Sequence, residues 1–411
     1  MDRDLLKSRI AKLPHLPAIN PERHLEELDD EEEEALDNFP SESSFKKPRR
    51  RALPGVDYSP LSASGYFSTA LQVDVPVTNV YASSKSVSPA ATAPETLATF
   101  RVYYTPPPSP PPCTSNLLDP DDEHDGSGGC SVVFVCVHGA GYSGLSWACL
   151  AQELVEKGDG KVGVLAYDAR GHGKTVLPPA VTSEVDLIDM SLEYMANDLV
   201  ALLKAMYPVR AQAPSLILVG HSMGGAVVAE ACNTLVRDVA EVAGIVVIDV
   251  VEGTAIEALS GMSALIAGQP KMFDSPEDAI AWHVESRTIN NIASARVSVP
   301  PLLRPLQDGA ARQGWRVDLQ QTEPFWRGWF TGLSGKFLAC RAAKLLLLAG
   351  TDRLDKDLLI GQMQGKYQLE IDPHVGHCVH EDAPGRTAET LLSFHERNQR
   401  VDLPQPLRKI P

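Results

Sequence analysis

Short apolar runs alternate with segments of helical periodicity from residue 131 onward. Continuous apolar runs bounded by turns are typical of strands buried on both faces of a parallel sheet. Between two of them, residues 192–206 place Met195, Leu199 and Leu203 on one face, which predicts an amphipathic helix. The pattern predicts an α/β fold with helices on both faces of a mostly parallel sheet. The expected strands are 131–137, 162–167, 215–219, 245–250, 344–349 and 367–371.

The alternation stops between residues 252 and 340, which we interpret as a cap inserted over the sheet. Large aromatics suit three roles here: the cap's own core, the wall of a substrate pocket, or anchors for a protein partner. The sequence leaves these roles open. Four of the five tryptophans belong to the segment: Trp282, Trp315, Trp326 and Trp329.

The ends of the chain differ from this central pattern. Before residue 99 few apolar positions repeat at any period and prolines are concentrated, so we expect residues 1–98 to be a largely disordered tail. A single α/β domain is expected over 99–398, with a strand near 99–104 and a proline-rich, acidic loop insertion at 105–130. Residues 399–411 are expected to form a short C-terminal tail.

Charge and composition narrow the possible partners. The net charge of −16 disfavours nucleic acid, although nine carboxylates lie in residues 26–37 and five cations in 46–51. Both clusters are typical of solvated tails, and the basic one also fits a nuclear-import signal. No apolar run suits a signal peptide or a membrane span, so we expect no membrane partner and a cytoplasmic or nuclear location. Seven cysteines without paired spacings argue against a disulfide framework.

A serine lies at a sharp strand-to-helix junction. The apolar run 216–219 leads directly into Gly220-His221-Ser222-Met223-Gly224-Gly225, and residues 226–231 continue as a helix. Such a turn exposes the serine Oγ at the sheet edge and leaves room only for small neighbours. A dinucleotide site is excluded because the spacing is Gly-x-x-x-Gly-Gly. Ser222 is therefore the predicted nucleophile.

Attack on a carbonyl requires two donors for the oxyanion and a base for the serine proton. The Met223 N–H, directly after the nucleophile, is the first predicted donor. The second should come from the segment His138-Gly139-Ala140-Gly141 after the first buried strand, with Ala140 preferred and Gly141 next. The base should be a late histidine, and His377, flanked by Gly376, is the choice.

Two other histidines lie in the same segment, His374 and His380, which we expect to be surface or capping residues. The spacing His-x-x-His-x-x-His also resembles a zinc motif, but no separate carboxylate cluster accompanies it. The acid has two candidates, because Asp249 ends the fourth expected strand and Asp352 follows the fifth. Fold position alone slightly favours Asp352.

Four segments together resemble the protein phosphatase methylesterases, in particular fungal-type members. They are residues 220–226, 248–255, 345–364 and 376–384, within a resemblance that covers about 131–397. The resemblance implies an α/β-hydrolase fold, with nucleophile Ser222, base His377 and acid Asp249 in place of Asp352. One departure is Ala140 where the family has glycine; the backbone donor remains, so activity should survive.

The resemblance implies a specific reaction: removal of the methyl ester from the C-terminal leucine of the protein phosphatase 2A catalytic subunit. The methylated tail of that subunit would be the partner, and the chemistry needs no cofactor or metal. Two other functions stay open. The chain could be a phosphatase-binding protein in which binding matters more than turnover, or a small-molecule serine esterase.

Overall fold

The computed structural model describes residues 55–78, 80–82, 96–108, 131–179, 187–306, 312–350 and 354–399. Several features of the sequence lie outside these ranges. They are residues 1–54 with both charged clusters, most of the loop insertion (109–130), the candidate acid Asp352 and the C-terminal residues 400–411.

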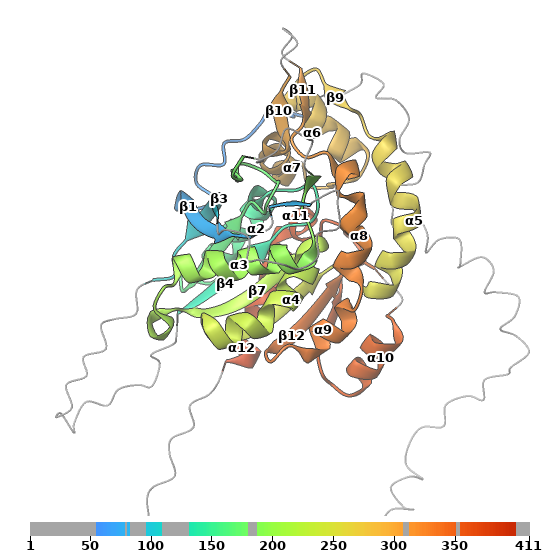
Figure 1. Cartoon of the computed structure of the whole chain (residues 1–411). Helices are drawn as coiled ribbons and strands as arrows, with labels where there is room; N and C mark the ends of the chain where they lie inside the picture. Colours follow the sequence, from blue (N-terminus) through green and yellow to red (C-terminus); the bar gives the residue numbers. More distant parts are fainter. Residues whose placement is uncertain are drawn as a thin grey trace, which may run out of the picture. The chain divides into compact units, whose positions relative to one another are not determined.

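Among the described residues, eight strands form the main sheet in the order β1-β3-β5-β4-β7-β8-β12-β13 (Figure 1). The strands from β5 to β13 pair in parallel, while β1 and β3 are antiparallel. This confirms the mostly parallel sheet. The strands are β1 Thr69–Val77, β3 Thr96–Thr105, β4 Val132–Val137, β5 Val162–Tyr167, β7 Ser215–His221, β8 Val242–Ile248, β12 Ala343–Leu348 and β13 Gln368–Ile371.

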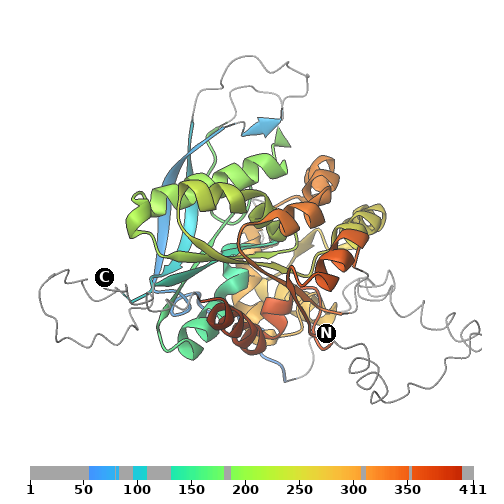
Figure 2. The ribbon, with the colours of Figure 1, turned by 90° about the horizontal axis from the view of Figure 1, so that it is seen from below.

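Alternation along β4 shows why the sheet needs helices on both faces. Val133 and Val135 face one core cluster, whereas Val132 and Phe134 face another. Successive side chains of a strand point to opposite faces, so a run that is apolar throughout must be covered twice. The first face is covered by α3 Leu192–Met206 and α4 Met223–Asp238, and the second by α2 Ala148–Lys157 and α12 Pro384–Asn398 (Figure 2).

The N-terminal boundary of the domain lies earlier than residue 99. Strand β1 pairs along its whole length with β3, and Val75 and Val77 are buried in the core. The periodicity of β1 is weak because it is an edge strand, where polar Gln72 and Pro76 are tolerated. The expectation of a largely disordered segment up to residue 98 was therefore wrong for this part.

We define the insertion as the segment between β8 and β12, residues 249–342. Its helices include α5 Glu252–Gly268, α6 Pro276–Glu285, α7 Ile292–Ser298, α8 Glu323–Phe330 and α9 Leu333–Ala339. Three short strands, β9 Met272–Phe273, β10 Leu303–Pro305 and β11 Gln313–Trp315, form a separate sheet. The 3-10 turns of the insertion are η5 Pro300–Leu302 and η6 Leu319–Thr322.

The tryptophans of the insertion divide between two cores. Trp326 and Trp329 are buried in the main core, so they fasten the insertion to the sheet domain. Trp282 and Trp315 pack at a ring distance of 6.0 Å within the insertion's own core. Core packing thus accounts for all four.

The remaining elements are short or lie near the C-terminus. They are β2 Tyr81–Ala82, β6 Leu187–Ile188, η3 Gly144–Trp147, η4 Arg210–Gln212, α10 Lys356–Met363 and α11 Val379–Asp382. In the part of the chain that the structure describes, no helix has both the length and the apolar character to cross a membrane.

Candidate active site

Ser222 occupies the turn between β7 and α4, as the sequence predicts. Its φ of 52° is in a region that L-residues rarely adopt, and its N–H donates to the Ile248 carbonyl at 3.0 Å. A Cβ at Gly220 would lie 2.2 Å from the Gly224 carbonyl oxygen, and one at Gly224 would lie 2.1 Å from that of Val137. Both flanking positions therefore require glycine, and this close packing holds the serine in its strained conformation.

Asp249 lies just after β8 and contacts the predicted base. Its Oδ2 lies 2.7 Å from His377 Nδ1, and its Oδ1 accepts the Ala349 N–H at 2.7 Å. The carboxylate is nearly buried, at 11% exposed, whereas the His377 side chain is 40% exposed. With one oxygen on the backbone of the next strand, Asp249 has a fixed orientation and presents the other oxygen to the imidazole.

His221 connects the nucleophile turn to the histidine loop, which we define as residues 372–383. Burial lowers the pKa of His221 far below its usual value, so its ring is neutral. Its Nε2 lies 2.9 Å from the His377 carbonyl oxygen, and because that oxygen can only accept, Nε2 carries the proton. The His221 and His377 rings are 4.6 Å apart. Ser222 and Asp249 thus follow the carboxyl ends of β7 and β8, and contacts to His221 and Asp249 hold His377 at the same edge of the sheet.

The other two histidines of the loop differ from each other. His374 is exposed, as expected. His380 is fully buried and stacks on Trp147 with ring centres 4.0 Å apart, so it is not a surface residue; its position before α12 does not reveal this contact. Within the described residues no cluster of His, Cys, Asp or Glu side chains is arranged to hold a metal.

The predicted oxyanion donors are located in the oxyanion loop, residues 138–142, and at the start of α4. Within the described residues, neither the Ala140 N–H nor the Met223 N–H donates to a protein acceptor, so both can donate to a ligand. The Gly141 N–H instead donates to Nε2 of His172 at 2.9 Å. Gly141 is therefore not a free donor, because an imidazole outside the predicted site already accepts from it.

His172 is not among the site residues that the sequence predicts. It lies in Gly171-His172-Gly173, after β5, and only its position between two glycines could have drawn attention to it. A second contact joins the oxyanion loop to the histidine loop, since the Cys378 thiol donates to the Tyr142 hydroxyl at 3.1 Å. Burial raises the pKa of Cys378, which makes it the packed neutral thiol of a structural contact.

The fold agrees with comparisons to known proteins. Residues 134–390 match the model of the alpha/beta hydrolase family. Two solved structures with similar folds are a peroxisomal α/β-hydrolase from Saccharomyces cerevisiae, at TM-score 0.58, and E-2-(acetamidomethylene)succinate hydrolase, at 0.56. The first covers 84% of this chain and 92% of its own, the second 80% and 100%; each is 16% identical, so they show the fold alone.

Closer similarity is found among curated fungal proteins named protein phosphatase methylesterase 1. The protein from Cryptococcus neoformans var. neoformans is 41% identical, over 96% of this chain and 92% of its own. Those from Yarrowia lipolytica and Schizosaccharomyces pombe are 44% and 45% identical, over 75% and 68% of this chain and 71% and 79% of theirs. The chain belongs to the protein phosphatase methylesterase family of α/β hydrolases.

Proposed function

We propose that the chain is a serine carboxylesterase that removes the methyl ester from the C-terminal leucine of the protein phosphatase 2A catalytic subunit. The observation that carries the proposal is the 2.7 Å contact between Asp249 and His377. Membership in the methylesterase family supports the reaction type. The phosphatase substrate is supported by the names of the relatives and by the resemblance of the sequence.

The reaction would proceed by acyl transfer. Ser222 Oγ attacks the ester carbonyl while Nε2 of His377 takes the serine proton; Asp249 holds the Nδ1 proton and stabilises the imidazolium. The tetrahedral intermediate collapses, the bond to the methoxy group breaks, and His377 protonates the departing methanol. Water, activated by His377, then attacks the acyl-enzyme and releases the free leucine carboxylate and Ser222.

The negative oxygen of each tetrahedral intermediate needs donors that are already in place. The N–H groups of Ala140 and Met223 are the candidates for this role. The oxyanion loop lies next to the nucleophile, because a Cβ at Gly139 would be 3.4 Å from the Ser222 Cβ. We therefore assign the oxyanion hole to Ala140 and Met223.

The insertion supports an apolar substrate end. Leu319 of η6 lies so close to the oxyanion loop that a Cβ at Gly141 would be 2.9 Å from its Cδ1. Ala140 of the oxyanion loop and, from α5, Leu259 and Met262 are partly buried and pack against one core cluster. Such a surface suits a leucyl side chain better than a charged one, so the insertion is suited to cap the substrate site.

Incubation with the methylated phosphatase 2A catalytic subunit tests the proposal. Ser222→Ala should lower the rate of ester loss by at least about 10⁴-fold while phosphatase binding stays within about threefold. Ser393→Ala, an exposed serine of α12, is the matched control and should behave as wild type. Absence of ester loss with the wild-type protein would overturn the proposal.

The same assay separates the other two functions. If Ser222→Ala still inactivates the phosphatase as wild type does, binding is the function that matters. If the wild-type protein hydrolyses a free leucyl-peptide methyl ester as efficiently as the folded subunit, it is a general esterase. Preference for the folded subunit by at least about tenfold in kcat/KM supports the proposed substrate.

We also propose a cytoplasmic or nuclear location. The basic cluster at residues 46–51, outside the described residues, supports nuclear import. Imaging the tagged full chain tests this: loss of nuclear signal on replacing the five cations by alanine would support import, and an unchanged distribution would contradict it.

A further inference from the structure

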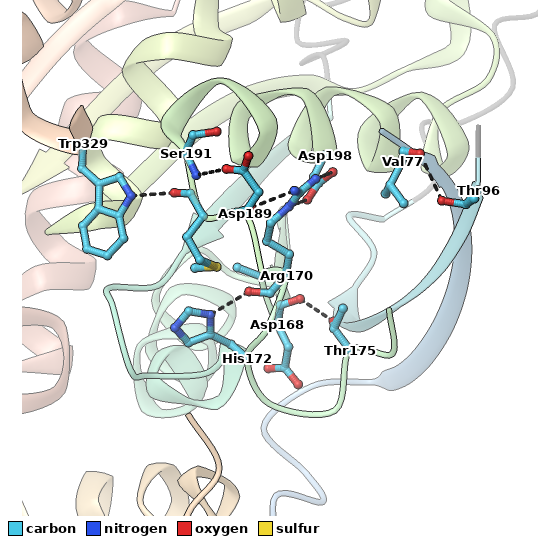
Figure 3. A network of polar contacts seen from close by, with 12 residues as sticks. Val77, Thr96, Asp168, Arg170, His172, Thr175, Asp189, Ser191, Asp198 and Trp329 are labelled. Carbon is cyan, nitrogen blue, oxygen red and sulfur yellow. Dashed lines mark hydrogen bonds and ion pairs between the residues drawn. The ribbon is translucent and has the colours of Figure 1, made fainter. Parts of the chain in front are cut away.

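The oxyanion loop depends on a histidine with no assigned role. His172 is buried, and Figure 3 shows it next to Arg170 in a network of polar contacts between the segment after β5 and α3. Its Nε2 accepts the Gly141 N–H at 2.9 Å, and its Nδ1 lies 2.9 Å from the Arg170 carbonyl oxygen. A backbone N–H can only donate and a carbonyl can only accept, so the ring is neutral with its proton on Nδ1. Burial also lowers the pKa of His172 to about 4, which favours the same form.

The direction of the Ala140 N–H depends on the two peptide planes that flank this residue. The Gly139 carbonyl accepts from the Tyr142 N–H at 3.2 Å and from His138 Nδ1 at 2.8 Å. Because the peptide bond is planar and trans, the Ala140 N–H must point away from those two donors. The following peptide plane is held by the Gly141 N–H on His172. Each of the two peptide planes that meet at Ala140 is thus held by a buried neutral imidazole, the first by His138 and the second by His172.

His172 in turn has a rigid support. The Arg170 side chain forms two hydrogen bonds with Asp198, at 2.6 and 2.7 Å, and both side chains are buried. Arg170 Nη1 also donates to the Asp189 carbonyl at 2.9 Å. Next along the chain, the Met190 carbonyl accepts from Trp329 Nε1 of α8 at 2.7 Å. Figure 3 shows Asp189 and Asp198 on Arg170, two residues before His172, with the Trp329 contact beside them.

We propose that His172 is a positioning residue for the oxyanion hole. Its neutral ring holds the Gly141 N–H and so fixes the peptide plane that follows Ala140, while His138 holds the preceding plane, which carries the Ala140 N–H. With both planes fixed, the Ala140 N–H keeps its direction toward the developing oxyanion. Among the described residues His172 makes no hydrogen bond to Ser222, so it acts through the loop. This rests on the proposed function, because the oxyanion hole has a purpose only if Ser222 attacks a carbonyl.

His172→Phe tests the proposal, since it keeps a ring of similar size and removes the acceptor for Gly141. We expect kcat for a leucyl-peptide methyl ester to fall about 10- to 100-fold, with KM within about twofold, because the lost alignment acts in the transition state. His172→Gln, whose amide oxygen can accept, should recover part of the loss. The matched control is His283→Phe, another buried histidine that bonds a backbone carbonyl, located in α6.

Comparison of the two variants decides the outcome. A kcat for His172→Phe within twofold of His283→Phe would overturn the proposal, since it would reduce His172 to ordinary packing. Equal melting temperatures with unequal kcat would support it. Wild-type protein that neither hydrolyses the ester nor reacts with a fluorophosphonate probe at Ser222 would instead contradict the proposed function.

A spectroscopic measurement covers the case in which His172→Phe does not fold. In wild-type protein labelled with ¹⁵N-histidine and ¹⁵N-glycine, His172 should show a protonated Nδ1 and an unprotonated Nε2 at neutral pH. A scalar coupling across the hydrogen bond should join Nε2 to the Gly141 amide. A protonated Nε2 would overturn the proposal, whatever the activity.

Discussion

The two loops that frame Ser222 are supported in opposite ways. In the oxyanion loop, neutral buried imidazoles hold the Gly139 carbonyl and the Gly141 N–H. In the histidine loop, His377 is 40% exposed, and behind it lie polar groups of His380 and Glu381 that have no hydrogen-bond partner among the described residues. The first loop is preorganised by its contacts, whereas the second depends on the protonation of buried groups.

Burial explains how the histidine loop tolerates these groups. It lowers the pKa of His380 to about 3 and raises that of Glu381 to about 8; the nearby Ser298 hydroxyl opposes the second shift but is outweighed. Both side chains are therefore mainly neutral at pH 7, so no bare charge is buried. The difference indicates that the oxyanion donors are held by hydrogen bonds, whereas the loop that carries the base His377 depends on the protonation of the buried groups next to it. Three predictions test this.

The largest effect should come from Asp249→Asn. His377 is held at its Nδ1 by this carboxylate, so the change should favour the wrong tautomer and lower kcat by about 10⁴-fold, with little change in KM or stability. Steady-state kinetics on the leucyl-peptide methyl ester provide the measurement. Asp372→Asn, in the same loop but paired with Arg386, is the control and should retain activity within about twofold.

The opposite result would reassign the acid. If Asp249→Asn keeps its activity and Asp352→Asn loses it, Asp352 is the carboxylate that orients His377. The support of the histidine loop would then be different, because the carboxylate that orients His377 would follow β12 and not β8.

The next effect concerns stability and pH. Glu381 has a folded pKa of about 8, above its ordinary value of 4.5, so the folded state holds the proton more tightly. Its contribution to the free energy of unfolding is fully present below pH 4.5 and is lost as the pH rises to about 8, by up to about 5 kcal/mol. The glutamine of Glu381→Gln cannot titrate, so the free energy of unfolding of this variant should rise relative to that of wild type as the pH increases from 4.5 to about 8.

Urea unfolding at several pH values between 5 and 8 measures the difference. Parallel curves for wild type and Glu381→Gln would show that Glu381 keeps the same protonation in both states. Buried water would then have to satisfy the carboxylate, and the histidine loop would be as well supported as the oxyanion loop.

The sequence predicted those parts of the site that follow from local geometry. Strand, turn and helix around Ser222 require small residues at set positions, and the apolar runs identify the buried strands. Asp249 was different, since spacing alone favoured Asp352 and only the family resemblance selected the acid. Long-range pairing between strand ends has no local pattern to reveal it.

Other features depend on contacts between distant segments. The Gly141 N–H is taken by His172, which is 31 residues away, and His380 is buried by Trp147. Strand β1 was missed because only one of its faces is buried, and only near its C-terminal end. In each case a partner far along the chain decides the environment, so residue type and spacing were insufficient.

The smallest effect should come from Ala140→Gly, which introduces the glycine that the family resemblance implies at this position. The Ala140 N–H remains, and its direction is set by the peptide planes that His138 and His172 hold, so kcat should change by less than about twofold. Glycine would loosen the unfolded chain and cost at most about 1 kcal/mol in stability.

The same substitution becomes informative in a double-mutant cycle with His172→Phe. Once the imidazole no longer holds the Gly141 N–H, the added freedom of glycine should misalign the donor, so the combined loss in kcat should exceed the product of the single losses. Strict additivity would show that the two positions act independently. A tenfold loss from Ala140→Gly alone would mean that the methyl group, and not the imidazole contacts, keeps the oxyanion loop in place.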